Sequence, residues 1–279
     1  TIRKLVRRVT WFGAAVLLLW APLSGQEASL LVGGVHARYA DSLSGTAALT
    51  TLQLSGSTSN TAGTVTGSLS RFSSGEWVTQ VAGFGAAVTE VGRGVSLGAS
   101  VAGDANRIQG GNWNGQASAG LLGVLSALRT LVTVGASVGG ARTVYDSAVG
   151  LNVLSLRVGR TVGKGTTLSG GIVGVRSDTV EYADVSLELN YTHSRVRASA
   201  SGGIRSGDLA DDPWGQAHFE FDLLPSLTYE LTLGRYPQSL VGFTDGLYAT
   251  TGIRVRVPGR TPPLGAAERP VEIVRLDET

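Results

Sequence analysis

The stretch VSLELNYT, residues 185–192, alternates apolar and polar side chains without a break. The apolar residues begin at Val185 and recur at every second position as far as Tyr191. A period of two is that of a β-strand, in which successive side chains point to opposite faces. The stretch is therefore predicted to be a strand with one apolar (oily) face and one polar (wet) face.

The same alternation fills most of the chain. Residues 213–223 repeat it with phenylalanines on the oily face, and residues 226–236 repeat it with leucines. Between residues 28 and 257 we count fourteen such runs, bounded by Gly, Asn, Asp, Ser or Pro and without a competing helical period. The runs cover residues 29–40, 46–56, 64–73, 76–88, 94–103, 114–126, 129–140, 147–160, 164–177, 181–192, 195–205, 213–223, 226–236 and 246–257.

The length of the runs separates two architectures that both alternate. A soluble β-sandwich uses strands of about five or six residues with a charged outer face. Runs of about ten residues match a tilted strand that crosses about 25 Å of hydrocarbon. Because a sheet in lipid must pair all its backbone groups, it has to close on itself. The fold class is predicted to be all-β, a closed antiparallel transmembrane β-barrel of about 14 strands.

The connections between runs alternate in length. If the N-terminal end of the barrel is periplasmic, the longest connections all fall on the external side, as they do in outer-membrane barrels. A sandwich has no reason to sort its connections in this way. The long external connections are residues 104–113, 206–212 and 237–245, and the short periplasmic ones are 127–128, 193–194 and 224–225.

The N-terminal segment has the pattern of a signal peptide. Four of the first eight residues are basic, and an apolar run follows at residues 11–21 before Pro22. A transmembrane helix is the alternative, but it needs about 20 apolar residues and this run stops earlier. The predicted organisation is a signal peptide at 1–25, an outer-membrane barrel at 28–257 and a periplasmic segment at 258–279.

The C-terminal segment has two interpretations. Several prolines and Gly265 resemble a linker, and residues 271–276 then alternate like a β-strand. The segment is either a loose periplasmic tail or a linker followed by the first strand of a further soluble domain. A carbohydrate-binding or glycogen-binding module is one candidate, and polysaccharide would then be its partner.

Composition excludes several classes of function. The 23 basic and 21 acidic residues are scattered along the chain and give a net charge of +2, so no basic face indicates nucleic acid binding. There is no Cys for a disulfide or a thiolate metal site. The three His residues have no nucleophile or carboxylate motif at a useful spacing, so we expect no enzyme, no cofactor and no metal.

Charged residues gather on the wet face of the last five runs. This face is expected to line the lumen, where charges of mixed sign pair across strands, either to constrict a pore or to close it. The wet face of the first half carries Ser, Thr, Gly and Gln instead, for example in residues 64–70. Aromatic residues near the run ends, among them Tyr182, Trp214 and Tyr248, suit either membrane interfaces or packing between strands. The candidate lumen-lining residues are Glu188, Arg195, Arg197, His218, Glu220, Asp222, Glu230, Arg254 and Arg256.

On these features the chain resembles the bacterial outer-membrane β-barrel superfamily over residues 28–257. Thr250, Gly252, Val255 and Val257 follow the spacing of the terminal-strand signal of that superfamily, although the chain continues beyond Val257. The resemblance implies insertion into outer-membrane lipid and recognition by the barrel assembly machinery. It implies a porin-like protein in the bacterial outer membrane.

Two functions follow from this architecture. The first is a passive or weakly selective pore, which the polar inner face favours. The second is a largely filled barrel that anchors a periplasmic binding domain, which the segment after Pro270 favours.

Overall fold

A computed structural model describes residues 27–39, 44–58, 60–109, 111–142, 148–208, 212–236 and 246–258. The predicted signal peptide and the predicted periplasmic segment, apart from Pro258, lie outside the described residues. No helix in the described part of the chain is long and apolar enough to cross a membrane. The strands are β1 Glu27–Tyr39, β2 Ser44–Ser57, β3 Thr61–Phe72, β4 Trp77–Gly92, β5 Val95–Ile108, β6 Asn114–Ala127, β7 Thr130–Arg142, β8 Ala148–Gly163, β9 Thr166–Ser177, β10 Glu181–His193, β11 Val196–Gly207, β12 Asp212–Leu224, β13 Leu227–Tyr236 and β14 Gly246–Pro258.

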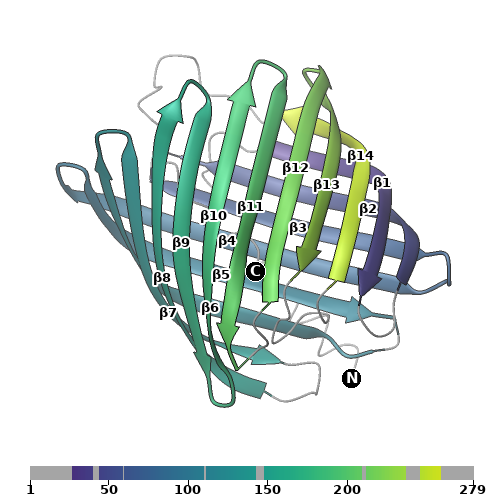
Figure 1. The fold of residues 1–279 in the computed structure, drawn as a ribbon, viewed down its shortest axis with the longest axis horizontal. Coiled ribbons are helices and arrows are strands. Elements are labelled where there is room, and N and C mark those ends of the chain that lie inside the picture. The colour runs from purple at the N-terminus through teal and green to yellow at the C-terminus, as the bar shows by residue number, and fades with distance from the viewer. Residues whose placement is uncertain are drawn as a thin grey trace.

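These strands form one closed barrel (Figure 1). Each strand pairs antiparallel with the next in sequence, and β14 pairs antiparallel with β1 to complete the ring. The closing register runs without a break from Glu27 opposite Pro258 to Tyr39 opposite Gly246. The prediction of an all-β, closed antiparallel barrel of fourteen strands is confirmed.

The predicted starting residue of one connection is wrong. The segment 104–113 was expected to be a loop, but β5 continues through Asp104 and Asn106 to Ile108. Asp104 lies opposite Gln116 and Asn106 lies opposite Asn114 on β6. Asp and Asn are common turn residues, but here both side chains occupy inward positions of the strand. Asp104 accepts a hydrogen bond from Gln116, and Asn106 is buried.

The turns at one end of the barrel are short. Five of the connections at this end, at 93–94, 128–129, 164–165, 194–195 and 225–226, contain two residues each, whereas 237–245 at the other end contains nine. Leu128 and Arg129 both have positive φ, 46° and 69°, as a two-residue turn between twisted strands requires. The sorting of connections by side therefore agrees with the alternation seen in the sequence. We call the two ends the short-turn end and the long-loop end.

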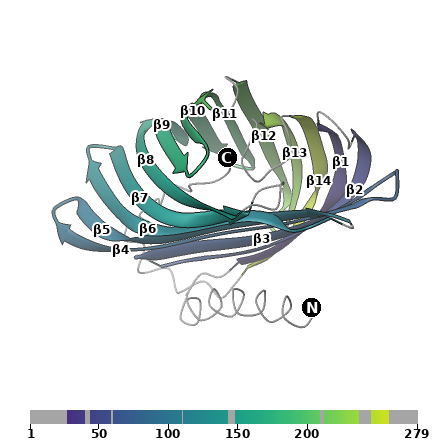
Figure 2. The ribbon, with the colours of Figure 1, turned by 90° about the horizontal axis from the view of Figure 1, so that it is seen from below.

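The barrel is flattened rather than circular. Figure 2 shows β3, β4 and β5 as a flat side, with β8 to β13 arching over it. Outward positions carry exposed apolar side chains such as Leu121, Leu154 and Leu187, which are 73%, 67% and 65% exposed. They form the oily surface that a barrel presents to lipid.

The inner face of the first strands is more apolar than the sequence suggested. Besides its Ser and Thr residues, it carries buried apolar side chains that pack into two clusters, one at each end of the barrel. The alternation hid them, because both faces of these strands contain apolar residues. One cluster contains Leu31, Val35, Ala37, Ala47, Leu49, Phe72, Val78 and Tyr248, and the other contains Ala86, Val88, Leu122 and Val124.

The closure of the ring depends on a pair of facing glycines. Gly33 on β1 lies directly opposite Gly252 on β14, and a Cβ at Gly33 would overlap the carbonyl oxygen of Thr251. A Cβ at the next residue, Gly34, would meet only the carbonyl oxygen of Ala47 at 3.7 Å, which is an ordinary contact.

We therefore expect Gly33→Ala to destabilise the barrel by about 2 kcal/mol or more, because the backbone must shift at the seam. The measurement is the fraction of refolded protein that migrates as the compact form on a gel before boiling. Gly34→Ala is the matched control and should fold like the parent chain. Equal folding of the two variants would contradict the tight seam.

Candidate functional site

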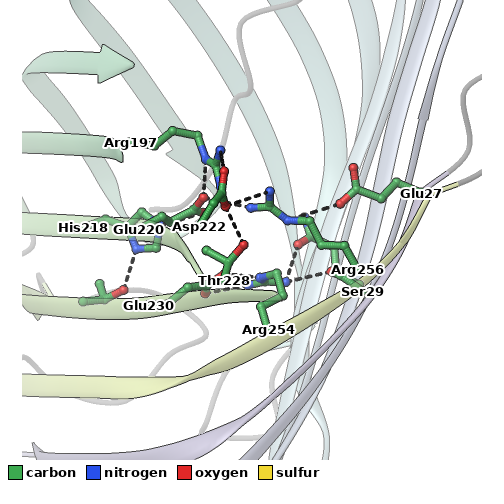
Figure 3. Close-up of polar contacts among 12 residues, drawn as sticks. Glu27, Ser29, Arg197, His218, Glu220, Asp222, Thr228, Glu230, Arg254 and Arg256 are labelled. Atoms are coloured by element: carbon green, nitrogen blue, oxygen red, sulfur yellow. Dashed lines mark hydrogen bonds and ion pairs between the residues drawn. The ribbon is translucent and has the colours of Figure 1, made fainter. Parts of the chain in front are cut away.

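Strand register gathers charged residues on one inner wall, near the short-turn end. Arg197 on β11 lies directly opposite Glu220 on β12, and Glu220 lies directly opposite Glu230 on β13. Arg254 and Arg256 follow on β14, two residues apart and so on the same face. Figure 3 shows these side chains pointing toward one another inside the barrel.

Two facing glutamates would repel each other, and arginines neutralise them. Directly opposed like charges destabilise a sheet. Arg197 binds both Glu220 and Asp222, with its Nη atoms 2.8 and 2.6 Å from the Asp222 carboxylate. Arg256 donates to Glu220 at 2.9 Å, and Arg254 holds both oxygens of Glu230. The wall is therefore a network of charge-assisted hydrogen bonds.

The network also crosses the seam that closes the barrel. Nη1 of Arg254 donates to Oγ of Ser29 on β1 and to Oε1 of Gln53 on β2, both at 2.9 Å. Nε of Arg256 lies 3.5 Å from a carboxylate oxygen of Glu27 on β1. Side chains thus connect the last strands to the first two, in addition to the backbone ladder.

The polar contacts of His218 belong to the same network and do not form a catalytic arrangement. Its Nδ1 lies 2.7 Å from the hydroxyl of Thr232, and its Nε2 lies 3.0 Å from Oε1 of Glu220. If the Thr232 hydroxyl acted as a nucleophile, free N–H donors would be needed to stabilise the oxyanion that forms. The neighbouring backbone N–H groups belong instead to the hydrogen-bonded ladders of β11 to β13. The arrangement is suited to pairing charges.

His218, Glu220 and Glu230 place ligand atoms within 4.8 Å of one another, so a metal ion has to be considered. Both carboxylates are already bound by arginines. A cation at this point would have to displace guanidinium groups and would be repelled by those that remained. The residues do not fit a metal site.

A second cluster lies toward the long-loop end. Arg205 is fully buried, donates to the Asp184 carboxylate and stacks over the ring of Tyr182, with Cζ 4.4 Å from the ring centroid. Nε1 of Trp214 donates to the other oxygen of Asp184 at 2.8 Å. The indole lies against Gly203, where any side chain would collide with it.

Sequence reasoning missed this cluster. Asp184 is on the same face as Glu188, and Arg205 is on the same face as Arg197, so the period of two could have found both. The interface interpretation is wrong for Tyr182, Trp214 and Tyr248, which point into the barrel. Tyr248 donates to Gln216 at 2.7 Å from within the apolar cluster of the first strands.

The remaining predicted residues fall in three places. Glu188 pairs with Arg157 on β8 and accepts from Asn190 at 2.8 Å, so it forms a separate inner pair. Arg195 lies in the exposed turn between β10 and β11, outside the strand wall. On β14, the proposed assembly signal turns Thr250 and Gly252 inward, while Val255 and Val257 are exposed on the outer face.

Removing one partner from the network should be costly because it leaves a buried charge. The side chains of Arg254 and Glu230 are only 13% and 6% exposed. Arg254→Ala is expected to lower the free energy of unfolding by about 3 kcal/mol. Urea unfolding in lipid vesicles measures this change.

Two further variants sharpen this test. Arg254→Met combined with Glu230→Leu should recover most of the loss, since no unpaired charge remains. Arg176→Ala breaks an exposed pair with Glu181 and should cost less than about 0.5 kcal/mol. If Arg254→Ala behaves like Arg176→Ala, the network does not stabilise the wall.

Comparison with known proteins finds matches in structure but not in sequence. No family model matches the chain, and no curated protein matches it. A TodX monoaromatic hydrocarbon channel with a deletion superposes with a TM-score of 0.50 at 10% identity, covering 87% of this chain and 92% of that one. The CymD monoaromatic hydrocarbon channel gives a TM-score of 0.50 at 11% identity, covering 84% and 88%. OmpF of Salmonella typhi gives 0.47 at 10% identity, covering 83% and 97%.

The two structures with a TM-score of 0.50 are both described as monoaromatic hydrocarbon channels. At such low identity the likeness concerns the fold alone. It agrees with the closed ring, the exposed apolar outer face and the polar inner wall. The chain therefore shares the closed β-barrel fold of the two monoaromatic hydrocarbon channels.

Proposed function

We propose that the chain is a passive or weakly selective pore in the bacterial outer membrane. The observation that carries this proposal is a solvent-accessible part of the inner face on β4. Gln80 and Ala82 on β4 occupy inward positions and are nevertheless exposed. Gln80 is held by the hydroxyl of Ser68 at 3.2 Å, on the polar inner face of β3.

The outer surface and the last strand support the location. Exposed leucines and valines on outward positions require a lipid environment, and the closed ring leaves no edge unpaired within it. The spacing of Thr250, Gly252, Val255 and Val257 supports recognition by the barrel assembly machinery. The solutes of the similar channels are not assigned to this chain.

A largely filled barrel is the second candidate, because the apolar clusters and the arginine network occupy part of the interior. Such a barrel would hold a periplasmic binding domain, for which polysaccharide is the proposed partner. Fourteen strands lie between the filled barrels of eight and the open channels of sixteen or more. Conduction separates the two functions.

The test is ion conduction by the refolded, full-length protein in planar bilayers. A pore gives discrete conductance steps in KCl, whereas a filled barrel inserts without them. Boiled protein, which no longer migrates as the compact form, serves as the negative control at equal protein concentration. Compactly migrating protein that repeatedly fails to conduct would overturn the pore and favour the anchor.

A further inference from the structure

Arginines occupy the outer face of the barrel at the long-loop end. The odd-numbered strands run toward this end, and five of them carry an arginine at their last or second-last position. All five lie at outward positions, because they alternate with the inward residues of the same strands. They are Arg71 on β3, Arg107 on β5, Arg142 on β7, Arg176 on β9 and Arg235 on β13.

The charge of this outer face is almost entirely of one sign. At the outward strand positions whose side chains the structure describes, Glu181 is the only carboxylate. It lies 3.7 Å from Arg176, and both side chains are largely exposed. The strand positions at the long-loop end therefore carry a net positive charge toward the surroundings of the barrel.

The arginines begin where the apolar outer face ends. Leu69 lies two residues before Arg71 on the same face and is 40% exposed, and Leu233 lies two residues before Arg235 and is 48% exposed. Two residues of a strand span about 7 Å. In a membrane the guanidinium groups therefore lie just beyond the hydrocarbon, at the level of the lipid head groups.

Two of these arginines flank a tryptophan on the flat side formed by β3, β4 and β5 (Figure 2). Arg71 lies directly opposite Trp77, with its Cζ 5.2 Å from the ring centroid. Arg107 lies opposite Thr79, which follows Trp77 on the same face of β4. Nε of Arg107 donates to the carbonyl oxygen of Gly111 at 2.9 Å. Among the described residues, no carboxylate pairs with either of these two guanidinium groups.

A guanidinium group without a carboxylate partner is suited to phosphate. Its planar fork can donate two parallel hydrogen bonds to phosphate oxygens, and its charge is permanent. The indole of Trp77 combines an apolar ring with a polar N–H, which suits the boundary between hydrocarbon and head groups. A head group beside Trp77 would thus receive donors from Arg71 on one side and from Arg107 on the other.

We propose that Arg71, Trp77 and Arg107 bind the phosphate of an anionic lipid head group in the leaflet at the long-loop end. The occupant is a lipid and not free phosphate, because the apolar face directly below the arginines already contacts acyl chains. The arginines of β7, β9 and β13 extend the same positive belt around the barrel. The inference rests on the proposed function for the membrane location, but it does not require conduction.

The experiment measures the quenching of Trp77 fluorescence by brominated lipids around the refolded protein. Brominated phosphatidic acid, whose head group is a bare phosphate, is compared with brominated phosphatidylcholine. The part due to Trp77 is the difference between each protein and its Trp77→Phe counterpart. The parent protein is expected to bind phosphatidic acid in preference beside Trp77.

Arg107→Gln leaves the contact of Arg71 with Trp77 in place and removes one of the two charges. It should lower the ratio of the association constants of the two lipids roughly fivefold. Arg107→Lys keeps the charge and should keep most of the preference. Compact migration before boiling establishes that each variant is folded.

Arg160→Gln is the matched control. Arg160 is also an exposed, outward-facing arginine, but it lies on β8 near the short-turn end. This variant loses the same charge as Arg107→Gln and should keep the ratio of the parent protein at Trp77.

The outcomes separate this inference from the proposed function. Equal binding of the two lipids by the parent, or an Arg107→Gln variant with the ratio of the parent, overturns the lipid site and leaves the pore intact. Loss of the preference when inorganic phosphate replaces chloride at equal ionic strength also overturns it, because soluble phosphate then occupies the arginines. Folded protein that keeps the preference but does not conduct overturns the pore and supports the lipid site.

Discussion

Backbone hydrogen bonding in a medium without water is the constraint on which this structure depends. Every N–H and C=O inside the hydrocarbon must have a partner, and only a closed ring gives all strands two neighbours. The pairing of β1 with β14 provides this closure along the whole of β1. The glycine pair at Gly33 and Gly252 permits close approach there, and Arg254 then adds side-chain bonds from β14 to β1 and β2.

Closure in turn decides where charge can lie. Charged side chains on the lipid face are costly, so the charges in the middle of the strands are directed inward. Inside the barrel, a charge that loses its water without gaining a partner is costly as well. Arginine offsets this cost because its guanidinium group offers several hydrogen-bond donors to neighbouring carboxylates. The direct opposition of Glu220 and Glu230 is tolerable only because Arg197, Arg254 and Arg256 lie around them.

The strands could be predicted from the sequence, whereas the partners inside could not. A period of two repeated fourteen times leaves few alternatives, and it fixes the face of each residue. It does not fix which residues meet, because that depends on the register of adjacent strands. Arg157 was therefore not recognised as the partner of Glu188. The inward apolar residues of β1 to β6 were missed for another reason, since a strand with two apolar faces has no contrast to detect.

Small residues explain why some aromatic side chains lie inside the barrel and not at the predicted membrane interface. Tyrosine and tryptophan near strand ends usually suggest a membrane interface. Here Gly203 leaves room for the ring of Trp214, and Gly234 leaves room for that of Tyr248, both inside the barrel. Each ring then reaches a polar partner, Asp184 or Gln216, which a site facing lipid would not offer. The glycines in these strands thus do more than relax the backbone, because they decide that bulky aromatic groups fill the interior. A flattened barrel whose interior is partly filled by side chains follows.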